Sequence, residues 1–113
     1  MAEMYVEKEF VLCPKFEKTF AILGKKWNGL IIDVLIGEGP QRFVALARKI
    51  PDVSDRVLAE RLKELEKNQI IQKSCCDSNR SEYSLTEKGI ALERVMQEIH
   101  HWGEEWLTSQ DIS

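Results

Sequence analysis

Several features that would assign a chain to a membrane or to secretion are missing from this sequence. No apolar run approaches the ~18–20 residues that a membrane-spanning helix needs, so no action within a membrane is predicted. The segment from Met1 to Tyr5 has no basic stretch followed by an apolar one, and no secretion signal is expected. These absences lead us to expect a cytoplasmic protein.

Cysteine is scarce, and motifs that carry chemistry are missing. The three cysteines are an odd number without a Cys-x-x-Cys pair. This fits a reducing compartment better than a disulfide scaffold, and it disfavours a small thiol-redox protein. His100 and His101 are adjacent, so on a helix they would face about 100° apart and would not chelate an ion together. Without a Gly-rich phosphate loop or a nucleophile elbow, we predict a non-enzymatic protein with neither metal nor cofactor.

The composition is that of an ordinary globular protein. The 113 residues are 43% hydrophobic and 31% charged, which predicts one domain over residues 1–113. The net charge of −3 argues, taken alone, against nucleic acid, because phosphate neutralisation needs local positive charge. The distribution matters more: residues 41–80 carry nine Lys/Arg against six Asp/Glu, and the rest carry seven against thirteen. The middle of the chain is therefore basic between acidic ends.

The first half of the chain predicts four helices separated by strong breaks. A helix begins near Pro14 and stops at Gly24, and a second covers about 27–36 with an apolar stripe from Trp27 through Leu30 to Leu35. The segment 37–40, Gly-Glu-Gly-Pro, ends it. A short helix follows over about 43–49, and a four-residue turn over 51–54 separates it from a helix over about 54–68 that Ser54 can cap.

In the second half of the chain the spacing of apolar residues changes, which predicts a hairpin and one long helix. Residues 70–74 and 82–85 read as two strands around a polar turn. Thr86 can cap a final helix over about 87–107, whose apolar stripe is wider than a core of this size hides. The order predicts a mainly α fold with a small β-hairpin wing (α+β), a winged helix-turn-helix. In that arrangement the helix over 54–68 enters the major groove and the hairpin over about 70–85 is the wing.

Six sequence blocks in order and register resemble the HxlR-type regulators, a branch of the MarR-like winged-helix proteins. They are Cys13-Pro14, Leu23-Gly24-Lys25-Lys26-Trp27, Gly39-Pro40-x-Arg42-Phe43, Ile50-Pro51-x-Val53-Ser54, Leu58-x-x-Arg61-Leu62-Lys63-Glu64-Leu65 and Glu82-Tyr83-Ser84-Leu85-Thr86-Glu87-Lys88-Gly89. The resemblance implies a dimeric regulator that binds double-stranded DNA and responds to a chemical stress or metabolite, so that a small-molecule or electrophile effector is expected. The family's wing often carries prolines, whereas residues 74–83 here contain none and include Cys75 and Cys76.

The predicted contacts with a pseudo-palindromic duplex follow from this reading. Arg56 is the strongest candidate for reading a base, because Arg pairs bidentately with guanine O6 and N7. Arg42 and Arg80 are expected at phosphates or in a minor groove, and Arg61 is left open between DNA and a carboxylate at the core edge. The expected DNA-binding set is Arg42, Ser54, Asp55, Arg56, Ala59, Glu60, Lys63 and Arg80.

A homodimer is expected because a wide apolar stripe on a terminal helix is usually buried against something, and a second copy is the simplest partner. The segment Phe10–Leu12 is expected to contribute. The predicted interface on the last helix comprises Leu92, Val95, Met96, Ile99, Trp102 and Trp106.

Cys13 is the candidate redox sensor. In thiol-sensing members of the resembling family, the cysteine directly before this proline is the reactive one. The start of a helix, with Lys15 and Lys18 nearby, favours the thiolate and hence oxidation or alkylation. Cys75 and Cys76 are competitors, and an inert, half-buried Cys13 is the plain alternative. A winged-helix module that binds proteins rather than specific DNA is the alternative function that the acidic composition keeps open.

Overall fold

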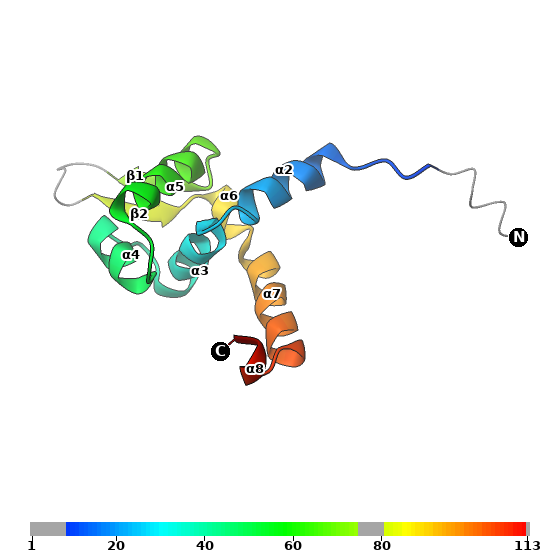
Figure 1. Cartoon of the computed structure of the whole chain (residues 1–113). Helices are drawn as coiled ribbons and strands as arrows, with labels where there is room; N and C mark the ends of the chain where they lie inside the picture. The colour runs from blue at the N-terminus through cyan, green and yellow to red at the C-terminus, as the bar shows by residue number, and fades with distance from the viewer. Residues whose placement is uncertain (1–8, 75–80, 113) are drawn as a thin grey trace, which may run out of the picture.

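The computed structural model of the chain describes residues 9–74 and 81–112, and it has the expected winged-helix architecture (Figure 1). Three helices and a hairpin form the body, from which two helices extend as arms. The elements in chain order are α2 (Pro14–Leu23), α3 (Asn28–Glu38), α4 (Phe43–Lys49), α5 (Asp55–Lys67), β1 (Ile71–Ser74), β2 (Glu82–Leu85), α6 (Glu87–Ile90), α7 (Glu93–Trp106) and α8 (Ser109–Ile112). None of the helices in the described part is long and apolar enough to cross a membrane.

The helix-turn-helix is formed by α4 and α5, whose bounds lie within one residue of those that the sequence predicts. The backbone leaves α4 at Ile50, and Pro51 follows, so the helix cannot continue. Ser54 then caps α5, since its hydroxyl oxygen accepts a hydrogen bond from the Val57 amide at 3.1 Å. Asp55 in the first turn and Lys67 in the last both suit the helix dipole.

The wing is an antiparallel hairpin whose register pairs Ile71 with Leu85 and Ser74 with Glu82. Gln41, in the linker between α3 and α4, exchanges two backbone hydrogen bonds with Tyr83, at 2.9 and 2.8 Å. This pairing attaches the wing to the helix-turn-helix, so the two units form one body.

The core lies between α3, α4, α5 and β1. Each of these elements contributes aliphatic side chains, which make a continuous buried cluster. The buried apolar residues are Ile31, Ile32, Leu35, Leu46, Ile50, Leu58, Leu62, Leu65, Ile70, Ile71 and Met96.

The second helix differs from its prediction in extent and in the face that it buries. It begins at Asn28 because Trp27 takes a left-handed conformation with φ of 82°, and it continues through Gly37 to Glu38. Leu30, predicted in the apolar stripe, is 52% exposed, whereas Asn28 is fully buried and donates to the Ile22 carbonyl at 2.9 Å. Most of this helix is apolar, so periodicity alone could not identify its buried face.

The prediction of one final helix over 87–107 was wrong, because a turn at Ala91–Leu92 divides it into α6 and α7. Thr86 does cap its start by accepting a hydrogen bond from the Gly89 amide at 3.1 Å. Gly89 lies so close to the Ile70 backbone that a Cβ would overlap the carbonyl oxygen. This contact holds α6 against the wing, and the turn then lets α7 leave in another direction (Figure 1).

Candidate nucleic-acid interface

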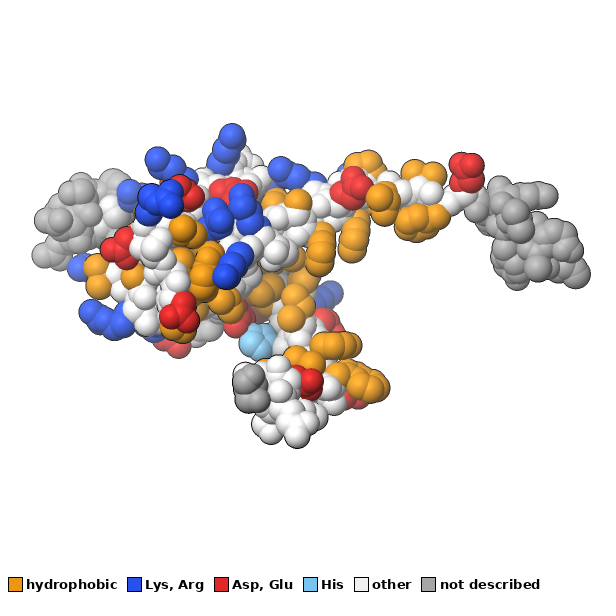
Figure 2. Space-filling model, in the orientation of Figure 1, with side chains coloured by type: hydrophobic (Ala, Val, Ile, Leu, Met, Phe, Trp, Pro, Cys, Tyr) orange, Lys and Arg blue, Asp and Glu red, His pale blue; other side chains and the backbone are white. Residues whose placement is uncertain are grey.

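The outer face of α5 carries every residue that the sequence placed there. Ser54, Asp55, Arg56, Ala59, Glu60 and Lys63 are all exposed. The opposite face holds Leu58, Leu62 and Leu65 in the core, so the outer face is fixed in orientation. Lys and Arg side chains gather over this part of the molecule (Figure 2).

Arg56 lies at the start of this face and is paired with Glu60. Its Nη1 is 3.3 Å from Glu60 Oε2, one turn further along the helix, and its side chain is 81% exposed. A pair so exposed is worth only a few tenths of a kcal/mol, so it costs little to release the guanidinium toward a base. Glu60 therefore orients Arg56 without immobilising it.

Arg61, which the sequence left open, belongs to the scaffold. Its Nε donates to the Lys26 backbone carbonyl at 3.1 Å, and its side chain is only 19% exposed. Lys25 pairs with Glu64 at 3.4 Å from the same turn. The two contacts attach α5 to the turn that precedes α3, so α3 and the candidate recognition helix move together.

The remaining predicted DNA contacts flank α5. Arg42 is the exposed N-cap residue of α4, at the start of the helix that braces α5. On the wing, Lys73 lies over the Tyr83 ring at 5.8 Å from its centroid, an exposed cation–π contact that orients the ammonium group. The prediction for Arg80 concerns a residue outside the described ranges, and so do those for Cys75 and Cys76.

Two arms expose a large apolar surface. On α2, Phe16 and Phe20 stack at 6.0 Å between centroids and are each 64% exposed, and the side chains of the preceding segment Phe10–Leu12 are exposed as well. On α7, Trp102 and Trp106 are 59% and 64% exposed. Orange side chains run along both arms in Figure 2. Contiguous exposed apolar surfaces of this kind commonly mark sites of protein–protein contact.

The predicted interface set on the last helix divides into two groups. Val95, Ile99, Trp102 and Trp106 are exposed and available to a partner. Met96 is only 7% exposed and joins the core, and Leu92 is half-buried against it. These two residues attach α7 to the chain's own body, because the apolar stripe is wide enough to serve both surfaces.

Cys13 lies at the expected place, as the N-cap residue of α2 with an exposed side chain. Its thiol does not cap the helix, and among the described residues it is a free cysteine. It stands next to the apolar arm, three residues from Phe16. A modification there would therefore change the surface that the arm presents.

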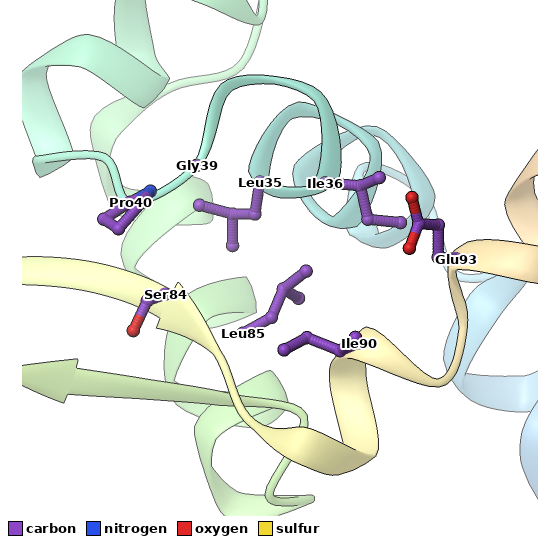
Figure 3. A pocket seen from close by; sticks show the side chains of 8 residues that line it. All are labelled: Leu35, Ile36, Gly39, Pro40, Ser84, Leu85, Ile90 and Glu93. Atoms are coloured by element: carbon purple, nitrogen blue, oxygen red, sulfur yellow. The ribbon is translucent and has the colours of Figure 1, made fainter.

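Two cavities flank the attachment of α7. One, of about 280 Å³, lies between α3, β2 and the α6–α7 turn, where Leu35, Leu85 and Ile90 form apolar walls and Glu93 stands at the edge (Figure 3). The other, of about 380 Å³, lies between the α2–α3 turn, α3 and α7, with Trp27, Met96 and His100 among its walls. The base of α7 is therefore bordered by an open pocket on each side.

One interaction at this base was not predicted. His100 Nε2 is 2.8 Å from Asp33 Oδ1 on α3. The hydrogen bond with Asp33, and then the charges of Asp33 and Glu104, raise the pKa of His100 above its usual value. The partners are 67 residues apart in sequence, so no local pattern could have paired them.

A braced helix with one solvent-facing side, joined to a β-hairpin, defines the winged helix-turn-helix class of DNA-binding proteins. Comparison with known proteins gives the family. The model of the HxlR-like helix-turn-helix family matches residues 22–111, so the chain belongs to that family of transcriptional regulators.

One curated relative and two solved structures illustrate the similarity. The HTH-type transcriptional regulator YodB of Bacillus subtilis is 46% identical over 102 residues, which cover 88% of this chain and 90% of that protein. The crystal structure of quinone-bound YodB superimposes with a TM-score of 0.74 at 48% identity, covering 84% of this chain and all of that one. The reduced form of the redox regulator HypR gives a TM-score of 0.77 at 31% identity, covering 88% and 99%.

Proposed function

We propose that this regulator acts as a homodimer that places the α5 helix of each copy in the major groove of a pseudo-palindromic duplex. The observation that carries the proposal is the outer face of α5, where Arg56, Ala59 and Lys63 are exposed on a helix fixed by its buried face. An α-helix about 10–12 Å across fits the major groove. Half-site centres about one helical turn apart, ~34–36 Å, are expected for paired recognition helices.

Within this complex the side chains divide by role. Arg56 reads a base edge, with Ser54, Asp55, Ala59, Glu60 and Lys63 lining the rest of the contact. Arg42 holds a phosphate beside α4, and Arg80 is assigned to the wing contact on sequence grounds alone. The exposed rows of α2 and α7 join the two copies, chiefly through Phe16, Phe20, Trp102 and Trp106.

Selection of bound fragments from random-sequence duplexes tests this function. The proposal expects an enriched site with two inverted half-sites, protected from cleavage as one footprint. A selection that enriches no sequence, while the protein remains folded and dimeric, would favour the alternative of a winged-helix module that binds proteins.

We also propose that Cys13 is the thiol through which a thiol-reactive molecule releases the DNA. Its exposure and its place beside the apolar arm support this, because an adduct there would alter how the two copies pack. The quinone-bound and diamide-treated crystal structures of the similar protein YodB support the same class of signal.

The test of Cys13 measures affinity for the selected duplex before and after mild diamide or quinone treatment. Wild type is expected to lose affinity, and Cys13→Ser is expected to keep it. A Cys75→Ser/Cys76→Ser double variant is the matched control and should respond like wild type. If Cys13→Ser loses affinity as wild type does, Cys13 is not the sensor.

A further inference from the structure

Within each copy, the base of α7 joins the proposed dimerisation arm to the proposed DNA-reading body. The arm is α7, which carries the exposed tryptophans. The DNA-reading body is formed by α3, α4, α5 and the hairpin of β1 and β2. Ile31, Ile32 and Leu35 of α3 are buried in the core with the apolar face of α5. Asp33 is on α3 and therefore moves with the recognition helix. His100 is on α7 and moves with the arm.

Apolar packing alone holds this joint weakly. Among the residues of α7, all of which are described, only Met96 is buried. The cavity of about 380 Å³ lies directly beside it, lined by Leu23, Trp27, Leu30 and Ile99 among others. A joint with one buried side chain and an adjacent cavity can change its angle at low cost.

The contact between His100 and Asp33 is the one ion pair that links α7 to α3 among the described residues. The Asp33 side chain is 35% exposed and that of His100 is 64% exposed. We propose that His100 and Asp33 form a positioning clasp, which fixes the angle between the dimerisation arm and the DNA-reading body and so sets the distance between the two recognition helices. This inference rests on the dimeric DNA-binding function proposed above.

A small change in the angle between α7 and the DNA-reading body is enough to alter the distance between the two recognition helices. The 14 residues of α7 span about 20 Å at 1.5 Å per residue. A swing of roughly 10° over that length displaces the body by about 3.5 Å, close to the ~3.4 Å rise of one base pair. The clasp therefore acts on the half-site spacing that the dimer accepts.

The clasp depends on pH in a defined direction. Asp33 and Glu104 both favour the protonated imidazole, and Lys25, which lines the same cavity, is itself paired with Glu64. Because the folded pKa of His100 is raised, the ion pair is complete below the ordinary histidine value of about 6.5, provided that Asp33 is ionised. It is lost as the pH rises through the raised value.

A distance measurement within one chain tests the clasp without DNA. Nitroxide labels at Glu66→Cys on α5 and Glu105→Cys on α7 would be introduced after the three natural cysteines are replaced by serine. Labelled chain is diluted into an excess of unlabelled chain, so each measured distance lies within one molecule. We expect a narrow distribution at pH 6.0 and a broader one at pH 8.5.

Three variants give the comparison. His100→Gln and Asp33→Asn are expected to show the broad distribution at both pH values. His101→Gln, at the neighbouring exposed position, is the matched control and should behave like the unsubstituted chain. A distribution in His100→Gln that is as narrow at pH 6.0 as in the control overturns the clasp.

Operator spacing gives the second readout, with all cysteines native and reduced. At pH 6.0 wild type should prefer the selected duplex over versions with one base pair inserted or removed at the centre. His100→Gln should lose about threefold of that preference, because each dimer loses two exposed ion pairs, and His101→Gln should keep it. Equal preferences in the two variants would overturn the role in spacing. A third outcome separates the two proposals. If His100→Gln broadens the distance distribution but the wild-type chain binds no duplex, the DNA-binding function is overturned and the clasp is still supported.

Discussion

Replacing Trp102 with alanine should separate dimer formation from folding of the chain. Trp102 is 59% exposed in the single chain, so the body loses little when it is removed. In the proposed dimer the indole is covered. An aromatic side chain buries about 150–250 Å² in full. The exposed share therefore corresponds to roughly 100–150 Å² removed from water on association, worth at most about 3–4 kcal/mol at ~25 cal/mol/Å².

Only part of buried area converts to affinity, so about 2 kcal/mol per copy is the expected loss. Each dimer contains two copies, and the dimer Kd should rise on the order of a thousandfold. Sedimentation velocity over a dilution series measures this, with circular dichroism to show that the helices remain. Val44→Ala, equally exposed at 60% on α4, is the control and should leave the Kd unchanged. A Trp102→Ala chain that dimerises like wild type would refute the interface on α7.

Three further substitutions test the body by urea unfolding. Ser54→Ala removes the cap that receives the Val57 amide and should cost about 1 kcal/mol, whereas Ser54→Thr should retain most of the stability; equal losses would contradict a capping role. Leu58→Ala empties a fully buried position and should cost about 2–5 kcal/mol, and a loss below 1 kcal/mol would contradict its place in the core. Gly89→Ala drives a methyl into the Ile70 carbonyl and should cost about 1–3 kcal/mol; an alanine that stabilises the protein would show that α6 does not pack as described.

Much of the DNA-reading body was predictable because its signals are local. Pro51 and Ser54 end one helix and begin the next, so the bounds of α4 and α5 followed from backbone chemistry. The exposed face of α5 followed from the spacing of Leu58, Leu62 and Leu65. Local rules work where each element has clear terminal residues and one apolar face.

The arms were harder to predict because tertiary packing decides where their helices end and which of their residues are buried. The apolar stripe of the last helix gave no indication that Met96 would enter the chain's own core while Ile99 remained exposed. The turn at Ala91–Leu92 lacks Gly and Pro and depends on how Gly89 docks against Ile70. The contact between His100 and Asp33 depends on the same packing, so it emerges only in three dimensions.

The central claim is that α5 reads DNA sequence, and quantitative binding by two arginine variants tests it most directly. Affinities for the selected duplex, and for the same duplex with single base changes, would be measured by fluorescence anisotropy over a series of salt concentrations. Arg56→Ala should lose about 1–3 kcal/mol and relax the preference at one base pair in each half-site. Arg42→Ala should weaken all duplexes alike and flatten the salt dependence. An Arg56→Ala protein that binds every duplex as wild type does would contradict the assignment of α5 as the recognition helix.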